Sequence, residues 1–241
     1  MSTKQVYRNG IWTLYESTTQ ERVAPFAPIL LYEEFFGTTL VAGATLWLAK
    51  DIHADATEAN IADQHGGVFG MGIGATDAEQ EAGLTMNDQL NFNLDKGFVI
   101  EYVASLKVLP TLLTEIYFGV GNNYVKGTLA AADQGPTVHA AFMFDGSGAC
   151  TLHTDDASTD NNAIATGVTV VAEAQHVFKI DFTTITDVLF FIDGNNVGSA
   201  TTFDMSNGSN VVVQPYMMVY KSAGAGLGTL YINSVRVWSK R

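Results

Sequence analysis

Residues 98–108 constrain the fold of this chain more than any other segment. Apolar side chains stand at every second position from Phe98 to Val108, and Glu101, Ser105 and Lys107 lie between them. A period of two is typical of a half-buried β-strand, because successive side chains point to opposite faces of a sheet. We therefore predict a strand over these residues.

Further segments of strand length recur along the chain with turn residues between them. The run 145–148, Asp-Gly-Ser-Gly, predicts one β-hairpin, and Gly194 with Asn195 predicts another. The other expected strands cover residues 29 onward, 115–120, 140–145, 149–154, 176–182, 187–193, 211–220 and 229–238. A helical pattern is found only over Thr76–Gly83. Strands without crossover helices predict antiparallel pairing in two packed sheets, so the fold class is an all-β sandwich.

The first 26 residues differ from the rest, because their apolar residues follow no sustained period and a polar run with prolines follows them. We predict an N-terminal arm or lead-in segment over 1–26 and a sandwich domain over 27–241. An extra edge strand of the same domain is the alternative. An arm of this kind needs a partner surface to become ordered. Its candidate partner-binding residues are Tyr7, Trp12, Leu14 and Tyr15.

The charge of the chain excludes some partners. It carries 12 Lys and Arg against 25 Asp and Glu, a net charge of −13, so general electrostatic attraction to nucleic acid or anionic lipid is not expected. Cys150 is the only cysteine and cannot form an intrachain disulfide. The N-terminus lacks a signal-peptide pattern, and no apolar run reaches the roughly 20 residues of a membrane helix. We expect a soluble protein made in a cytoplasm.

No catalytic constellation is apparent. A retaining glycosidase needs two carboxyl groups about 5 Å apart, yet Glu101 and Glu115 are expected to stand alone on outward strand faces. Glu33 and Glu34 are adjacent and would point to opposite faces. Cys150 has no evident base beside it, and Gly70, Gly72 and Gly74 fit a closely approached strand better than a phosphate loop. We therefore predict no catalytic or cofactor-binding residues and a protein that is not an enzyme.

Two polar stretches contain metal-ligand side chains. His53, Asp55, Asp63 and His65 occupy the first, and His153, Asp155, Asp156 and Asp160 occupy the second. Residues 155–162 could offer oxygens to Ca²⁺, but they lack the alternation and central glycine of a calcium loop. Turn residues that bind their own backbone explain the pattern equally well, and we predict no metal site.

Aromatic residues leave a binding function open. They could form a platform for sugar stacking or a protein contact, although aromatic side chains more often belong to a core. The candidates are Trp47, Tyr117, Tyr124, Tyr216 and Tyr220.

Two regions resemble a known fold family. Residues 31–40 followed by Trp47 are similar to the acidic entry segment of concanavalin A-like (laminin-G-like) jelly rolls. Segments 177–182, 189–195, 213–219 and 228–238 resemble, in that order, a strand, the Asp-Gly hairpin, the Pro-Tyr strand and the closing strand of that family. The same order occurs in structural virion proteins of tailed bacteriophages, and the resemblance covers residues 29–241.

The resemblance implies a jelly-roll sandwich and a virion structural protein. Within that class it implies a head decoration protein on the capsid surface, assembled in the host cytoplasm, that binds the major capsid protein and forms a dimer or trimer. A glycan-binding, lectin-like module on a tail or fibre is the alternative, with a surface glycan as its partner.

Overall fold

The computed structural model describes backbone and side chains of residues 30–35, 47–51, 53–62, 66–87, 89, 92–125, 127, 135–209 and 211–238, and the backbone alone of residues 3–8, 11–16, 22–23, 29 and 239. The described strands are β1 (Thr3–Arg8), β2 (Ile11–Glu16), β3 (Arg22–Val23), β4 (Ile29–Glu33), β5 (Leu48–Asp51), β6 (Thr57–Asn60), β7 (Phe69–Ile73), β8 (Gln80–Thr85), β9 (Phe92–Asn93), β10 (Phe98–Val108), β11 (Thr114–Gly121), β12 (Val138–Asp145), β13 (Ala149–Asp156), β14 (Asp160–Thr169), β15 (Gln175–Asp181), β16 (Leu189–Ile192), β17 (Asn195–Val197), β18 (Val212–Lys221) and β19 (Gly228–Ser239). Two single-turn 3₁₀ helices, η1 (Leu94–Lys96) and η2 (Ser206–Gly208), lie between strands.

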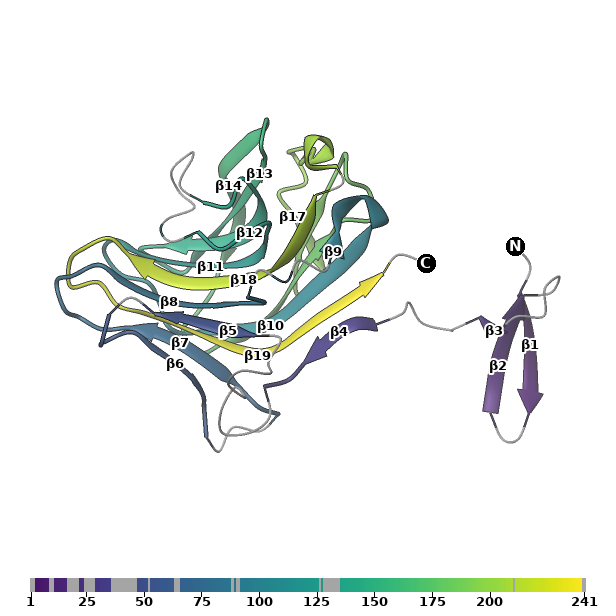
Figure 1. Ribbon diagram of the computed structural model, residues 1–241, viewed down its shortest axis with the longest axis horizontal. Coiled ribbons are helices and arrows are strands. Elements are labelled where there is room, and N and C mark those ends of the chain that lie inside the picture. The colour runs from purple at the N-terminus through teal and green to yellow at the C-terminus, as the bar shows by residue number, and fades with distance from the viewer. Residues whose placement is uncertain are drawn as a thin grey trace.

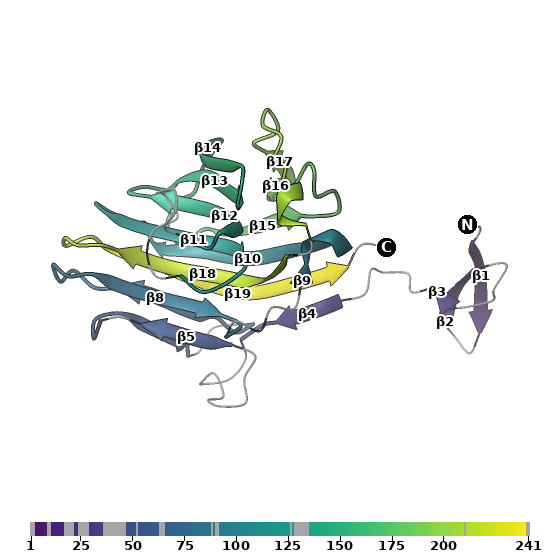
Figure 2. The ribbon, with the colours of Figure 1, turned by 45° about the horizontal axis from the view of Figure 1, so that its top comes forward.

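Two antiparallel sheets pack face to face (Figure 1). Sheet I has the order β17-β16-β15-β10-β19-β7-β6, with β4 also paired to β19. Sheet II has the order β14-β13-β12-β11-β18-β8-β5, with β9 also paired to β18. Figure 2 shows the same two layers from a second direction. The prediction of an all-β, two-sheet antiparallel jelly-roll sandwich is confirmed. No helix in the described part of the chain has the length and apolar character needed to cross a bilayer.

The core lies between the sheets and is built from alternate residues of each strand. Phe118 of β11 packs edge-on against Phe178 of β15, with ring centroids 4.9 Å apart. Ile100 and Tyr102 of β10 are fully enclosed, as the period-two pattern predicts. The Tyr102 hydroxyl crosses the core and donates a hydrogen bond to the carbonyl of Gly119 on the other sheet, which satisfies its polar group within an apolar interior.

Two β-bulges interrupt the pairing of β10 with β19, and both were missed in the sequence. Val103 pairs with Ser234 and Ala104 with Ile232, so Asn233 is an extra residue on β19. Lys107 is likewise extra on β10, between the pairs Leu106–Leu230 and Val108–Thr229. The second bulge turns Val108 out of the core face expected for it, and the Val108 side chain is 38% exposed.

The helical turn expected over Thr76–Gly83 is wrong. Gln80 begins strand β8, which pairs with β18 and β5 and is buried throughout. The Gln80 side chain accepts a hydrogen bond from the backbone N–H of Gly74 at 2.8 Å. The acidic residues at 77, 79 and 81 therefore follow the two-residue period of a chain entering a strand.

The N-terminal strands β1, β2 and β3 form a small sheet of their own. It lies apart from the sandwich in both views (Figure 1 and Figure 2). The structure therefore pairs these residues with one another and not with an edge of the sandwich. That they act as an arm reaching a partner stays a prediction.

Candidate functional site

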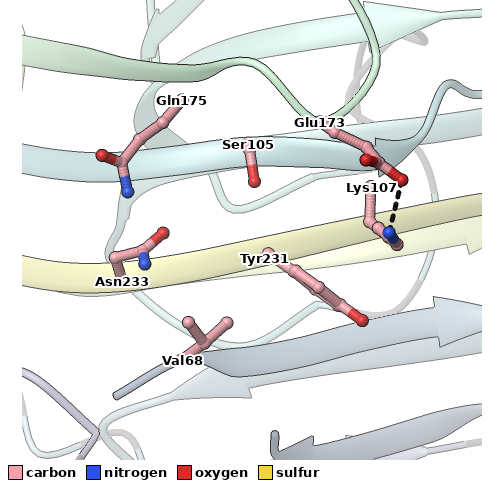
Figure 3. A pocket seen from close by; sticks show the side chains of 7 residues that line it. All are labelled: Val68, Ser105, Lys107, Glu173, Gln175, Tyr231 and Asn233. Carbon is pink, nitrogen blue, oxygen red and sulfur yellow. Dashed lines mark hydrogen bonds and ion pairs between the residues drawn. The ribbon is translucent and has the colours of Figure 1, made fainter. Parts of the chain in front are cut away.

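The outer face of sheet I carries a polar hollow of about 290 Å³. Figure 3 shows the Lys107–Glu173 pair at one end, Gln175 and Asn233 at the other, and Ser105 and Tyr231 between them. The lining comes from strands β10 and β19, from the first residue of β15 and from residues just before β7 and β15. It consists of Val68, Ser105, Lys107, Glu173, Gln175, Tyr231 and Asn233. Both bulged residues, Lys107 and Asn233, belong to this lining. Bulges re-aim side chains and are common beside functional sites, and both bulges between β10 and β19 lie at this hollow.

One row of paired residues explains the shape of the hollow. Gln175, Ser105, Tyr231 and Gly70 are in register across four neighbouring strands. Ser105 is too small to fill the space beside the Tyr231 ring. A methyl group at position 70 would lie 3.0 Å from Cε1 of Tyr231 and 2.7 Å from Cδ1 of Ile61, so glycine leaves room for the ring. The half-buried Tyr231 is held between two small residues.

The charged end of the hollow is fixed by an ion pair and a turn. Lys107 Nζ donates to the carboxylate of Glu173, and this contact raises the pKa of Lys107. The backbone N–H of Glu173 donates to the carbonyl of Leu106 at 2.8 Å. Glu173 has φ +66°, a left-handed conformation that glycine or asparagine adopts more easily than glutamate. The turn therefore holds Glu173 in an unfavourable backbone conformation that brings its carboxylate to Lys107.

These groups suit a ligand rich in hydroxyls. The amides of Gln175 and Asn233 and the hydroxyl of Ser105 can each donate and accept hydrogen bonds. Tyr231 adds an apolar ring with a polar tip. A few convergent polar groups beside an aromatic surface are typical of small-molecule sites, and the volume is at the lower limit of their range, about 300 to 1,000 Å³.

The outer face of sheet II is different, because its own side chains fill it. Tyr117, Tyr216 and Met218 are almost completely buried there, and Tyr220 is 8% exposed. The hydroxyl of Tyr117 donates to the carbonyl of Gly127 at 2.5 Å, and that of Tyr216 donates to the carbonyl of Val125. Tyr124 packs against the same cluster. Trp47 belongs to the main core, so these aromatic candidates pack inside the fold and do not form an open platform.

The acids of sheet II are less isolated than expected. Glu115, Tyr220 and Glu81 are in register on three neighbouring strands. Tyr124 donates a hydrogen bond to Glu81, which is fully enclosed. Glu115 shares its row with this second acid, so it does not stand alone as expected. Burial, with the hydrogen bond to Glu79, raises the pKa of Tyr220 to about 12. Tyr220 separates the two carboxylates of this row, so the row does not supply the close acid pair of a retaining glycosidase.

Three further glutamates, Glu58, Glu101 and Glu33, also interact with neighbouring groups of the fold. Burial raises the pKa of Glu58 to about 8, with the negative charges of Asp51 and Glu81 adding to the effect. Glu101 lies 3.9 Å from Arg236 across the sheet, which corrects the expectation that it stands alone. Glu33 accepts hydrogen bonds from the backbone of Phe35 at 2.7 Å and the indole of Trp47 at 3.2 Å.

The second polar stretch forms the hairpin in which the end of β13 pairs with the start of β14. Asp156 accepts from the backbone of Ser158 and Thr159 and, at 3.0 Å, from both the backbone and the amide of Asn207. His153 is 2% exposed, and burial lowers its pKa to about 4. In the described part of the chain, no three His, Cys, Asp or Glu side chains gather as metal ligands. Asp63 and His65 lie outside the described residues.

Cys150 and Lys221 are enclosed. Burial raises the pKa of the Cys150 thiol, so it is a poor nucleophile. Lys221 donates to the carbonyls of Gly74, Thr76 and Gly226 at 2.6, 2.8 and 3.1 Å. This lysine is therefore enclosed at one end of the sandwich, where it joins Gly74 and Thr76 to Gly226.

The predicted partner-binding residues lie in the small N-terminal sheet. Tyr7 pairs with Trp12, Gln5 with Leu14 and Lys4 with Tyr15. Nothing in the structure brings them to the hollow.

Comparisons with known proteins support the fold. No family model and no curated protein matches the chain. Among solved structures, a protein from work on mucin-degrading endo-acting O-glycanases of human gut bacteria has a TM-score of 0.62 at 12% identity, covering 89% of this chain and 100% of its own. An endo-beta-1,4-glucuronan lyase from the fungus Trichoderma reesei has a TM-score of 0.56 at 13% identity, covering 88% and 96%.

Two further solved structures have the same fold. The carbohydrate recognition domain of Emp47p has a TM-score of 0.52 at 11% identity and covers 84% of this chain and 94% of its own. A carbohydrate esterase of the Shiga toxin-encoding bacteriophage phi24B has a TM-score of 0.51 at 13% identity and covers 90% and 100%. At these identities the likeness shows a jelly-roll fold shared with carbohydrate-binding and carbohydrate-active proteins.

Two expectations change as a result. The prediction that the chain is not an enzyme is contradicted, because a lyase has the same fold and the missing close acid pair excludes only one kind of mechanism. The resemblance to jelly rolls is confirmed, whereas a capsid decoration protein finds no support among these structures.

Proposed function

We propose that this protein recognises carbohydrate, and that it does so at the hollow on sheet I. The observation that carries the proposal is the meeting of two bulges at a hollow lined by one tyrosine ring and by amide, hydroxyl and charged groups. Sugars offer hydroxyl groups for the polar side chains and an apolar ring face for an aromatic one. The carbohydrate-binding and carbohydrate-active proteins with this fold add support at the level of the fold alone.

A location on a virion stays a prediction. It is motivated by the resemblance of the closing segments 177–182 to 228–238 to virion proteins and by the bacteriophage source of one solved structure with this fold. A glycan-binding module on a tail or fibre combines that location with the hollow. Binding to a major capsid protein has no comparable support.

A glycan array tests the proposal. Wild-type protein should bind a defined subset of glycans, and Tyr231→Ala should lower the affinity for them about tenfold through loss of the ring contact. Tyr32→Ala is the matched control, since Tyr32 is a 47% exposed tyrosine on β4 outside the hollow. An array without binding, or equal losses in the two variants, would contradict the proposal.

A further inference from the structure

The hollow contains a charge pattern that bears on which sugars it accepts. Lys107 and Glu173 are the two charged residues in its lining, and they are paired with each other. The rest of the lining is neutral. We infer that the hollow selects uncharged sugars over uronic acids, with Glu173 as the residue that determines this specificity, an inference that rests on the proposed carbohydrate-binding function.

The position of Lys107 makes the role of Glu173 necessary. The bulge on β10 places the Lys107 side chain at the end of the hollow, where its ammonium would meet an incoming carboxylate. An unpaired ammonium of this kind attracts anionic ligands. The ammonium of Lys107 is already paired with the carboxylate of Glu173. A uronate that binds Lys107 must therefore break this ion pair and come close to a second negative charge.

The conformation of Glu173 strengthens the argument. Glutamate stands in the left-handed region, at φ +66°, although asparagine or glycine is favoured there. Its backbone N–H donates to the carbonyl of Leu106, which lies between the two lining residues of β10, Ser105 and Lys107. A strained residue held by its surroundings is a recurrent mark of a functional position. We attribute this strained backbone conformation to the ion pair, because it holds the Glu173 carboxylate against Lys107.

Two neighbouring cationic side chains on sheet I also contact groups of the protein itself. Arg236 lies beside Glu101 and over the ring of Tyr32, and Lys179 lies 3.8 Å from the ring centroid of Phe191. The net charge of −13 adds a general repulsion toward anionic polymers. The surface around the hollow therefore offers an acidic sugar no ready counter-charge among its described residues.

Calorimetric titration of the full chain tests the inference with two probes, a neutral hexasaccharide taken from the array and hexagalacturonic acid. Wild-type protein should bind the neutral probe and leave hexagalacturonic acid unbound or much weaker. Glu173→Gln should raise the affinity for hexagalacturonic acid, relative to that for the neutral probe, about threefold to fivefold, since it frees one exposed charge. The gain should shrink as salt is raised.

Glu101→Gln is the matched control, because it removes the same charge from the same face outside the hollow. An equal gain in this variant would show an effect of net charge alone and overturn the inference. Equal binding of both probes by the wild type would also overturn it while leaving carbohydrate recognition intact. A wild type that binds neither probe would overturn the proposed function itself.

Discussion

The two outward faces of this sandwich use the same strand geometry for opposite purposes. On sheet II, tyrosine and methionine side chains from neighbouring strands pack together, and the hydroxyls of Tyr117 and Tyr216 donate to the carbonyls of Gly127 and Val125. On sheet I, Tyr231 stands between Ser105 and Gly70, and a hollow remains beside it. Tyr117 stands in register between Met143 and Met218, and its hydroxyl is capped as well. Tyr231 has small neighbours in its row and a hollow beside it, so it keeps a surface for a ligand.

The largest effect should come from removing a tyrosine of the filled face. Tyr117→Ala should lower the free energy of unfolding by about 3 to 5 kcal/mol, the usual cost of a large-to-small change at a fully buried aromatic. Tyr231→Ala should cost less than about 1 kcal/mol, because its side chain is half-buried at the surface. Chemical denaturation measures both values. Equal losses would mean that Tyr231 is a structural residue like Tyr117.

Acid should destabilise the filled face before it affects the hollow. His153 has a pKa of about 4 in the folded chain against about 6.5 when unfolded, so its contribution to stability is fully present above pH 6.5 and is lost as the pH falls toward 4. The loss amounts to at most about 3 kcal/mol. Burial lowers the pKa of His139 as well, which acts in the same direction. Urea unfolding at several pH values should show a shallower fall in His153→Gln, and an unchanged slope would refute the assignment.

Adding a methyl group at position 70, beside the Tyr231 ring, should have a smaller effect on stability and a selective effect on glycan binding. Gly70→Ala should cost about 1 kcal/mol of stability, the low end for overpacking, and should weaken glycan binding severalfold by displacing the ring. Gly72→Ala is matched, because its methyl group would lie 3.0 Å from Thr229 Oγ1 and away from the hollow. Calorimetry should therefore separate two variants of similar stability. Equal affinities would contradict the role of Gly70.

The smallest effect should follow deletion of residues 1–26. Strands β1, β2 and β3 pair only with one another among the described strands, so the sandwich should keep its stability within about 0.5 kcal/mol and its glycan affinity unchanged. Thermal unfolding and titration of the shortened chain measure both quantities. A large loss of either would show that the small sheet supports one face of the sandwich.

Much of the fold could be read from local pattern. The alternation over 98–108 predicts β10, and the turn residues at 145–148 and 194–195 predict the hairpins β12–β13 and β16–β17. Strand β8 was missed because its acids resemble a helical turn until β5 and β18 are placed beside it. Pairing with other strands, and not local propensity, decides such a segment.

The hollow could not be predicted, because it depends on register. Ser105 and Lys107 were correctly expected on the outward face of β10, but nothing local ties them to Gln175 or Tyr231. The bulges at Lys107 and Asn233 exist only relative to the partner strand, so no single segment shows them. A change of phase in β19 offers the one local sign: Leu230 and Ile232 face the core at even positions, and Val235 and Val237 face it at odd ones.

The central claim is that the outer face of sheet I, and not that of sheet II, binds carbohydrate. Amide chemical shifts recorded by NMR during titration with the array-derived neutral hexasaccharide test it directly. We predict that the largest shifts fall at Ser105, Lys107, Gln175, Tyr231 and Asn233, with the amides of Glu81, Tyr117 and Tyr220 unmoved. Shifts centred on Tyr117 and Tyr220 with a silent hollow would contradict the claim.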